Sequence, residues 1–281
     1  MLNLRADLHI HTYYSDGLMS PAEVVAVAKN NGVRLIAVTD HDCMLAYPEV
    51  KDACGKNGLT AVNGIEISAY ENGVKVHTLG YNLNADCADF KSFSGSLFKA
   101  SVSRTEDILY KLNKNGVRLS IDEVLNERKF PSSPIHAMYI ARAASKKGYG
   151  NTPFAFYVEY LAQGKCAYSD IGRPSPECAV ELIAACGGFS SLAHPARIEM
   201  EKTVLKNLVK KLKACGLGGI EGVYSTHTVK ETAYYKEMAS AFNLFVTGGS
   251  DTHINGGKKI IGSPVFHVDK TLAQKLGVEI Q

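Results

Sequence analysis

Two histidines separated by one residue lie near the start of the chain, in His9-Ile10-His11. In an extended segment, side chains at positions i and i+2 point to the same side, so both imidazoles can reach one metal ion. Such a pair is weak evidence by itself, because two hydrogen-bonded histidines give the same pattern. Further side chains that can bind metals follow at widely separated positions. They are Asp16, His41, Glu66, His77, His194, Asp251 and His253.

These side chains fall near the ends of segments that are predicted to be strands. Short apolar runs of strand length occur at 4–9, 34–39, 60–67, 74–81, 188–193, 219–224 and 244–247. Most alternate with helical patterns, such as the one that begins at the capping box Ser20-Pro21-Ala22-Glu23. This alternation predicts parallel strands with helices outside. Nearly every candidate ligand then lies at or just past the carboxyl end of a strand, where barrels build their active sites.

Six of the nine histidines and three carboxylates are thus expected to converge on one rim. Neither packing nor solubility explains this arrangement. Crowding so many titratable groups would be costly unless cations compensate them. We therefore predict a multinuclear metal site.

The alternation of strands and helices stops between about residue 86 and residue 164. Helices are predicted there at 93–115, 120–128, 134–147 and 154–163. We interpret this region as an inserted helical subdomain. The chain then divides into a first barrel part (1–85), a helical cap (86–165) and a second barrel part (166–281).

The composition is that of an average globular protein. Of 281 residues, 46% are hydrophobic and 21% charged, which excludes disordered, collagenous and membrane classes. The net charge of +3 is too small to create an overall electrostatic field that would attract nucleic acid or an anionic membrane surface. The first residues show no secretory signal, no run approaches about 18 apolar residues, and the seven cysteines contain no C-x-x-C pair. We therefore expect a cytoplasmic protein with reduced thiols and no membrane partner.

As a set, the motifs resemble those of the polymerase and histidinol phosphatase (PHP) family of metal-dependent phosphoesterases. They stand here as Asp7-Leu8-His9-Ile10-His11-Thr12, Ser15-Asp16-Gly17, Thr39-Asp40-His41-Asp42, Gly64-Ile65-Glu66, His77-Thr78-Leu79-Gly80-Tyr81, Ala193-His194-Pro195 and Gly249-Ser250-Asp251-Thr252-His253. The resemblance covers nearly the whole chain. It implies an α/β fold, a distorted seven-stranded (β/α) barrel of PHP type with an inserted helical subdomain.

The resemblance also implies up to three divalent metal ions on the carboxyl-end rim, with Glu66 bridging two of them. The implied ligand sets are His9, His11, Glu66 and Asp251; Glu66, His77 and His194; and Asp16, His41 and His253. Four of these residues are expected to be catalytic, namely Asp16, Glu66, His194 and Asp251. Manganese is the leading expectation, with iron, zinc or magnesium as alternatives. Asp40 and Asp42 are expected to orient imidazoles by accepting their other ring N–H, although Asp42 could equally cap its loop.

Metal ions a few ångströms apart suit phosphoester hydrolysis. They lower the pKa of a bridging water, which gives hydroxide near neutral pH, and they neutralise the phosphoryl oxygens during in-line attack. Such a site needs no side-chain nucleophile.

Donor groups near the rim are expected to bind the phosphate of the substrate. The predicted residues are Arg104, His136, Lys165, Arg197 and His227, with Arg173 as a further candidate. Arg197 is favoured because it follows His194 by three residues. The insertion resembles the cap of relatives that hydrolyse nucleotides, in which the positions of Arg104 and His136 bind phosphate. Two departures stand out: those relatives commonly carry arginine where Ser101 and Pro134 stand here.

The leading prediction is a phosphomonoesterase acting on a small nucleotide such as a nucleoside 3',5'-bisphosphate. Alternatives with the same chemistry are a histidinol-phosphate-type phosphatase and a 5'-3' exoribonuclease on short RNA, since the near-neutral charge disfavours long polymers. Two further hypotheses are that the protein is a metal-bound scaffold without enzymatic activity and that it is a metal-dependent C–N hydrolase. The full ligand set counts against the scaffold, and the Asp251-x-His253 pair, which suits a third metal, counts against the C–N hydrolase. The sequence does not indicate the oligomeric state.

Overall fold

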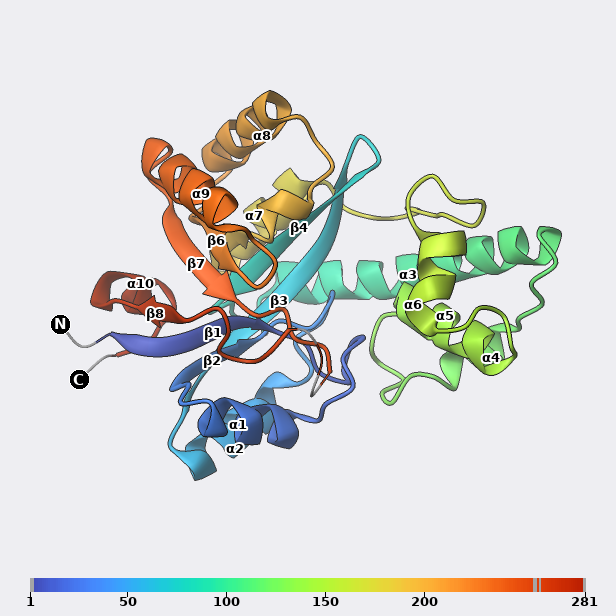
Figure 1. Ribbon diagram of the computed structural model, residues 1–281, viewed down its shortest axis with the longest axis horizontal. Helices are drawn as coiled ribbons and strands as arrows, with labels where there is room; N and C mark the ends of the chain where they lie inside the picture. Colours follow the sequence, from blue (N-terminus) through green and yellow to red (C-terminus); the bar gives the residue numbers. More distant parts are fainter. Residues whose placement is uncertain (1–2, 255–256, 258, 280–281) are drawn as a thin grey trace.

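The computed structural model describes residues 3–254, 257 and 259–279, whose strands form one curved sheet that is nearly closed into a barrel (Figure 1). The strand order is β7-β6-β5-β4-β3-β2-β1-β8. The strands are β1 (Leu4–Ile10), β2 (Leu35–Val38), β3 (Thr60–Glu71), β4 (Val74–Tyr81), β5 (Phe189–Leu192), β6 (Gly219–Tyr224), β7 (Phe245–Gly249) and β8 (Phe266–Val268). The predicted distorted barrel is confirmed, with one short strand, β8, beyond the seven expected.

The barrel closes where the segment after β7 meets β1. The backbone N–H of Asp251 donates to the carbonyl of His9 at 2.7 Å, and that of His11 donates to Thr252 at 3.0 Å. A Cβ atom at Gly249 would lie 2.4 Å from the Cβ of His9, so this approach requires glycine. The end of β7 is therefore fixed beside the candidate ligands of β1.

The expected parallel arrangement does not hold at β4, and the additional strand β8 is also antiparallel to its neighbour. β4 runs antiparallel to both β3 and β5, and β8 runs antiparallel to β1. β3 and β4 form a hairpin through Asn72 and Gly73, whose φ angles of 50° and 80° allow a tight turn. Glu66 consequently lies within β3 rather than at its carboxyl end, and His77 lies within β4, the strand predicted at 74–81.

Among the described residues, one set of helices surrounds the barrel (Figure 1). They are α1 (Pro21–Asn30), α2 (Tyr47–Asn57), α7 (Pro176–Ala185), α8 (Lys202–Ala214), α9 (Val229–Ala241) and α10 (Lys270–Lys275). The capping box at Ser20 is present, since its hydroxyl accepts from the backbone N–H of Glu23 at 3.2 Å. None of the helices that the structure describes has the length and apolar character needed to cross a membrane.

A second group of helices lies together on one side of the barrel, at the right of Figure 1. They are α3 (Ala88–Lys114), α4 (Ile121–Leu125), α5 (Ala137–Lys146), α6 (Pro153–Phe156) and the π-helical turn η1 (Tyr157–Leu161). They share a buried core that includes Leu112, Tyr139 and Phe156. Helix α5 begins later than predicted because Nδ1 of His136 caps it by accepting from the N–H of Met138 at 3.3 Å. The subdomain boundaries at 85/86 and 165/166 stay a prediction.

Candidate metal centre and adjoining pocket

The nine predicted ligands gather at one rim of the barrel. Eight of them are buried and His253 is half-buried. Among the described residues, three groups could each hold a metal ion, because the donor atoms within each group lie within 4.8 Å of one another. These groups are His9, His11, Glu66 and Asp251; His11, Asp16, His41 and His253; and His41, Glu66 and His77.

Glu66 occupies the centre of this cluster. Its Oε2 lies 3.2 Å from Nε2 of His9 and 3.1 Å from Nε2 of His11. Its Oε1 lies 2.7 Å from Nδ1 of His77 and 2.9 Å from Nε2 of His194. The two oxygens of one carboxylate thus face two different pairs of imidazoles, which is the arrangement a bridging ligand needs.

The three groups differ in part from the predicted ligand sets. The first contains the predicted residues, and in the second His11 joins the predicted three. The third holds His41 where His194 was expected, although His194 still contacts Glu66. The assignment of each ligand to an ion therefore stays a prediction.

Two residues of the cluster have backbone conformations that are rare for side-chain-bearing residues. The φ angle is 27° at His194 and 54° at Asp251. Such conformations cost on the order of 1–3 kcal/mol and persist only where the surroundings hold them. The N–H of His194 donates to Oε2 of Glu221 at 2.7 Å, which helps to hold the first of them. Strain retained beside a group of donors is typical of a functional site.

Glu221 is the most informative residue that the sequence analysis missed. It is fully buried in β6, and its Oε1 lies 3.0 Å from Nδ1 of His9. A carboxylate in this position fixes the ring orientation of a metal-binding histidine and raises its basicity. The signal in the sequence is a lone charged residue within the apolar strand at 219–224.

The expectation that Asp40 and Asp42 accept from imidazoles is wrong; the alternative for Asp42, that it caps its loop, remains consistent with its contacts. Asp40 accepts from the hydroxyls of Thr12 and Ser15, both at 2.6 Å. Asp42 accepts from the N–H of Ser68 at 2.8 Å and from Arg173 at 2.5 Å. Within the described part of the chain neither carboxylate contacts an imidazole. Both instead order the loops that carry the cluster.

The pKa values in the cluster reflect how closely its carboxylates and imidazoles are packed. Burial opposes the charge of Glu66, but His41, His77 and His9 hold the pKa of this carboxyl well below its usual range. Burial by itself would lower the pKa of His11, but hydrogen bonds and charges from Asp251 and Glu66 raise it to about 10. Burial lowers the pKa of His77 to about 4. Ionised carboxylates beside imidazoles are the donor set that divalent transition metals prefer, so the residues present fit such ions.

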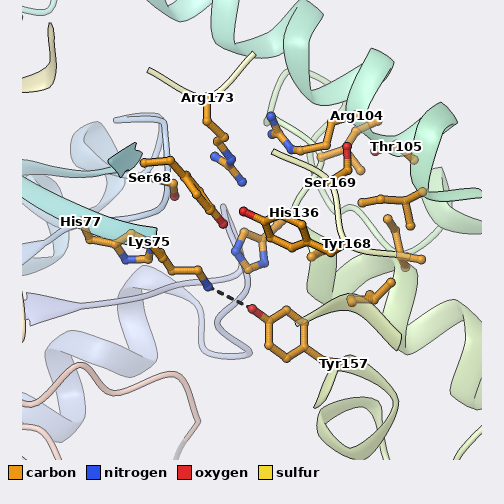
Figure 2. A pocket seen from close by; sticks show the side chains of 16 residues that line it. Ser68, Lys75, His77, Arg104, Thr105, His136, Tyr157, Tyr168, Ser169 and Arg173 are labelled. Carbon is orange, nitrogen blue, oxygen red and sulfur yellow. Dashed lines mark hydrogen bonds between the residues drawn. The ribbon is translucent and has the colours of Figure 1, made fainter. Parts of the chain in front are cut away.

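A pocket adjoins the cluster between the β3–β4 hairpin and the helices α3 and α5 (Figure 2). His136 lines it, with its ring stacked on His41 at 4.7 Å between centroids and Nδ1 3.5 Å from a carboxylate oxygen of Asp16. Arg104 lines it as well and donates to the carbonyl of Ile171 at 2.8 Å. The structure thus brings the predicted Arg104 and His136 together beside the candidate ligands.

The other predicted substrate-binding residues lie elsewhere. Arg197 lies beside Asp251, with Nη1 3.4 Å from Oδ2 of that carboxylate and 3.0 Å from the hydroxyl of Tyr224. His227 packs on Tyr224 at 5.2 Å between ring centroids. Lys165 is exposed in the turn after η1 and does not line the pocket. Substrate binding by Arg197, His227 and Lys165 stays a prediction.

Ser101 has a structural role that explains why arginine is absent there. The residue is fully buried, and its hydroxyl donates to the carbonyl of Phe98 at 2.7 Å. The same hydroxyl accepts from the N–H of Ile135 at 2.9 Å. Ser101 therefore ties α3 to the segment before α5, where Ile135 forms part of the pocket wall.

Comparison with known proteins agrees with the motifs and the fold. Residues 7–152, about half of the chain, match the PHP domain, so the chain belongs to the PHP domain family. The resemblance inferred from the sequence is thereby confirmed.

Three named proteins are similar over most of their length. The phosphoribosyl 1,2-cyclic phosphate 1,2-diphosphodiesterase of Eggerthella lenta is 29% identical, and the match covers 88% of this chain and 93% of that protein. The 3',5'-nucleoside bisphosphate phosphatase of Chromobacterium violaceum is 28% identical, over 89% of this chain and 87% of that protein. A 5'-3' exoribonuclease of Haemophilus influenzae is 28% identical, over 95% of this chain and 96% of that protein. All three names denote cleavage of phosphoester bonds. The chain is accordingly a phosphoesterase of the PHP family.

Two solved structures share the fold. One, from Chromobacterium violaceum, is described as an amidohydrolase with bound sulfate; it has a TM-score of 0.84 and 27% identity, and the match covers 94% of this chain and 91% of that chain. The other, from Bifidobacterium adolescentis, has a TM-score of 0.86 and 24% identity, over 98% and 96% of the two chains. The barrel and its helical insertion therefore recur in known proteins.

Proposed function

We propose that this protein is a metal-dependent phosphomonoesterase that hydrolyses a small nucleotide, such as a nucleoside 3',5'-bisphosphate. The observation that carries this proposal is the continuity of the cluster with the pocket. His77 contacts Glu66 and also lines the pocket, and His136 links the pocket to Asp16 in the same way. A small substrate that places one phosphate at the cluster would therefore have its neighbouring part beside the mouth of this pocket.

In this proposal the cluster holds up to three divalent metal ions, manganese foremost. Bound there, the ions supply a water activated for attack and neutralise the charge of the phosphoryl group. The residues that would hold them are His9, His11, Asp16, His41, Glu66, His77, His194, Asp251 and His253. Of these, Asp16, Glu66, His194 and Asp251 would be closest to the reacting atoms.

The surrounding residues hold and orient these groups. Tyr224 donates its hydroxyl to Oδ2 of Asp251 at 2.6 Å, and Lys259 contacts the same oxygen. The other oxygen, Oδ1, lies 3.2 Å from Nε2 of His11 and so stays directed at the cluster. Arg197, which is half-exposed beside Asp251, would bind a phosphoryl oxygen of the substrate.

Residues 86–165 would act as a cap over the sugar and base of the substrate. Support comes from the pocket lining, in which α3, α5 and η1 face the β3–β4 hairpin. A cytoplasmic location stays part of the proposal.

Chromatographic analysis of the products from a panel of substrates tests the proposal, because it detects free phosphate, ring-opened monoesters and nucleoside monophosphates alike. Protein reconstituted with manganese would receive adenosine 3',5'-bisphosphate, nucleoside monophosphates, histidinol phosphate, a ribose 1,2-cyclic phosphate and a 5'-phosphorylated RNA oligomer. We expect the bisphosphate to be hydrolysed fastest, with loss of its 3'-phosphate. Preference for the cyclic phosphate, histidinol phosphate or the RNA would assign one of the alternatives, and no turnover would contradict hydrolysis at this site.

A further inference from the structure

We propose that Cys87 and Cys186 form a redox-modification site, at which a peroxide converts the two thiols into a reversible disulfide. Cys186 directly follows α7 on the barrel, and Cys87 directly precedes α3. Helix α3 leads from the barrel into the helical insertion (Figure 1). The site therefore lies where these two parts of the chain join, and the inference does not depend on which phosphoester the protein hydrolyses.

Backbone hydrogen bonds hold the two cysteines beside each other. The N–H of Asn84 donates to the carbonyl of Cys186 at 3.0 Å, and the carbonyl of Asn84 accepts from the N–H of Cys87 at 3.1 Å. Both cysteine side chains then pack in one apolar cluster with Phe90 and Ile183. The two thiols are thus neighbours in the folded protein, although they lie far apart in the sequence.

Cys87 is placed to be the reactive thiol of the pair. It is half-buried, and the residues on either side of it, Asp86 and Ala88, are exposed, so a small oxidant reaches it from solvent. The partial positive charge at the start of a helix favours a thiolate there. The thiol of Cys186 and the backbone of Phe90 lower the pKa of the Cys87 thiol. More of this thiol is therefore ionised near neutral pH than of an ordinary cysteine, and the thiolate is the form that peroxides oxidise.

Cys186 has the properties of the thiol that completes the disulfide. It is 4% exposed and lies at the carboxyl end of α7, where a negative charge is disfavoured. Burial and the neighbouring Cys87 raise the pKa of the Cys186 thiol to about 11. Cys186 therefore stays protonated and shielded from the oxidant until Cys87 has been oxidised beside it.

The reaction consumes one peroxide in two steps. The Cys87 thiolate attacks one oxygen of hydrogen peroxide, so the S–O bond forms and the O–O bond breaks. The departing hydroxide takes up the proton that the Cys87 thiol had released and leaves as water. The sulfur of Cys186 then attacks the sulfenic acid, the S–S bond forms, the S–O bond breaks, and the departing hydroxide takes the proton of the Cys186 thiol. Two thiols and one peroxide thus give one disulfide and two waters, with the sulfurs oxidised and the peroxide reduced.

The disulfide would tie the helical insertion to the barrel. Helices α3 to α7 lie between the two cysteines in the sequence, so the bond closes a long loop that contains the insertion. A cross-link stabilises a folded chain mainly by restricting the unfolded chain, and more so when the loop is long. Oxidation should therefore make the protein harder to unfold.

Mapping the thiols of the parent protein tests the site without any substitution. Protein reduced with dithiothreitol and desalted would be treated with a small excess of hydrogen peroxide, alkylated with iodoacetamide and digested without reduction. We expect mass spectrometry to show two peptides joined through Cys87 and Cys186, which dithiothreitol separates. The absence of this pair, or oxidation of the exposed Cys166 and Cys178 while Cys87 is alkylated, would overturn the site.

The variants Cys186→Ser and Cys178→Ser test the roles of the two thiols. In Cys186→Ser the sulfenic acid of Cys87 has lost its partner, so dimedone, which reacts with sulfenic acids, should label Cys87. Cys178→Ser removes an exposed thiol of α7 and is the matched control, which should form the same disulfide as the parent protein. If dimedone does not label Cys87 in Cys186→Ser that is folded by circular dichroism, Cys87 is not the attacking thiol and the proposed reaction fails.

Urea unfolding measures the effect of the disulfide on stability. The oxidised parent protein should unfold at a higher urea concentration than the same protein kept in dithiothreitol, because only the oxidised chain is cross-linked. Cys186→Ser should give the same midpoint after both treatments. Equal midpoints for parent protein with and without the mapped disulfide would overturn the proposed tie between insertion and barrel.

Discussion

Glu221 and His9 face each other inside the barrel, with 3.0 Å between Oε1 of the carboxylate and Nδ1 of the ring. Both side chains are fully buried. A carboxylate that accepts from Nδ1–H leaves the lone pair of the ring on Nε2. That atom lies 3.2 Å from Glu66 and 3.5 Å from Asp251, so Glu221 presents His9 to the centre of the cluster.

Glu221→Gln should weaken manganese binding about 10- to 100-fold. The amide holds the ring of His9 less firmly than the carboxylate does, and the substitution removes the negative charge that makes this ring more basic. Titration against a chelator of known affinity measures this change. Glu237→Gln, at an exposed position of α9, is the matched control and should bind metal as the parent protein does. Unchanged affinity in a folded Glu221→Gln variant would show that the contact with His9 has no role in metal binding.

Arg197→Ala should raise KM for phosphorylated substrates about tenfold with little change in kcat, because its guanidinium would bind the phosphate in the ground state and the transition state alike. The side chain is 53% exposed, so the substitution should not disturb folding. Steady-state kinetics on the preferred substrate measure both constants. A large fall in kcat at unchanged KM would contradict this role.

Metal binding should release about one to two protons per protein at pH 7.5. The pKa of His11 is raised from 6.5 to about 10, so the ring is protonated in metal-free protein and must lose its proton to bind an ion. Affinity should therefore increase as the pH rises from 6.5 toward 10. Calorimetry in two buffers of different ionisation enthalpy counts the protons. Equal observed heats in the two buffers, before any correction for buffer ionisation, would mean that no proton is released and would contradict this protonation state.

Ser101→Ala should lower the free energy of unfolding by about 1–3 kcal/mol, because the buried N–H of Ile135 loses its acceptor. Urea unfolding followed by circular dichroism measures the change. Ser96→Ala is a suitable control, since Ser96 is exposed on the same helix and its hydroxyl bonds only to the carbonyl of Ser92. Equal stability of the two variants would show that Ser101 does not hold the pocket wall.

Local signals in the sequence predict much of the fold. The capping boxes at Ser20 and Ser120 mark the starts of α1 and α4 correctly. The alternation of strands and helices predicts the wrong direction for β4, whereas Asn72-Gly73, a strong signal for a hairpin turn, indicates the observed one. Strand β8 has three residues and pairs with β1 at one edge of the sheet. A segment this short contains no periodic pattern from which a strand could be predicted.

The residues of the site can be predicted from their types and their positions along the sequence. Which of these residues contact one another is harder to predict, because it depends on distances in the folded chain. Imidazoles and carboxylates at the ends of several strands had to converge once a barrel formed. The position of His41 beside His77 and Glu66 depends on how the loops pack, which spacing does not show. The pairing of Arg173 with Asp42 joins residues 131 positions apart, so it also follows only from the tertiary structure.

In the proposed function, metal ions at the cluster around Glu66 carry out the hydrolysis. This is tested by measuring bound manganese and phosphate release together in the parent protein and in Glu66→Ala, after both are loaded with manganese. Because the two oxygens of Glu66 face different pairs of imidazoles, we expect the variant to lose both metal and activity. Full metal content with normal turnover in Glu66→Ala would contradict the account.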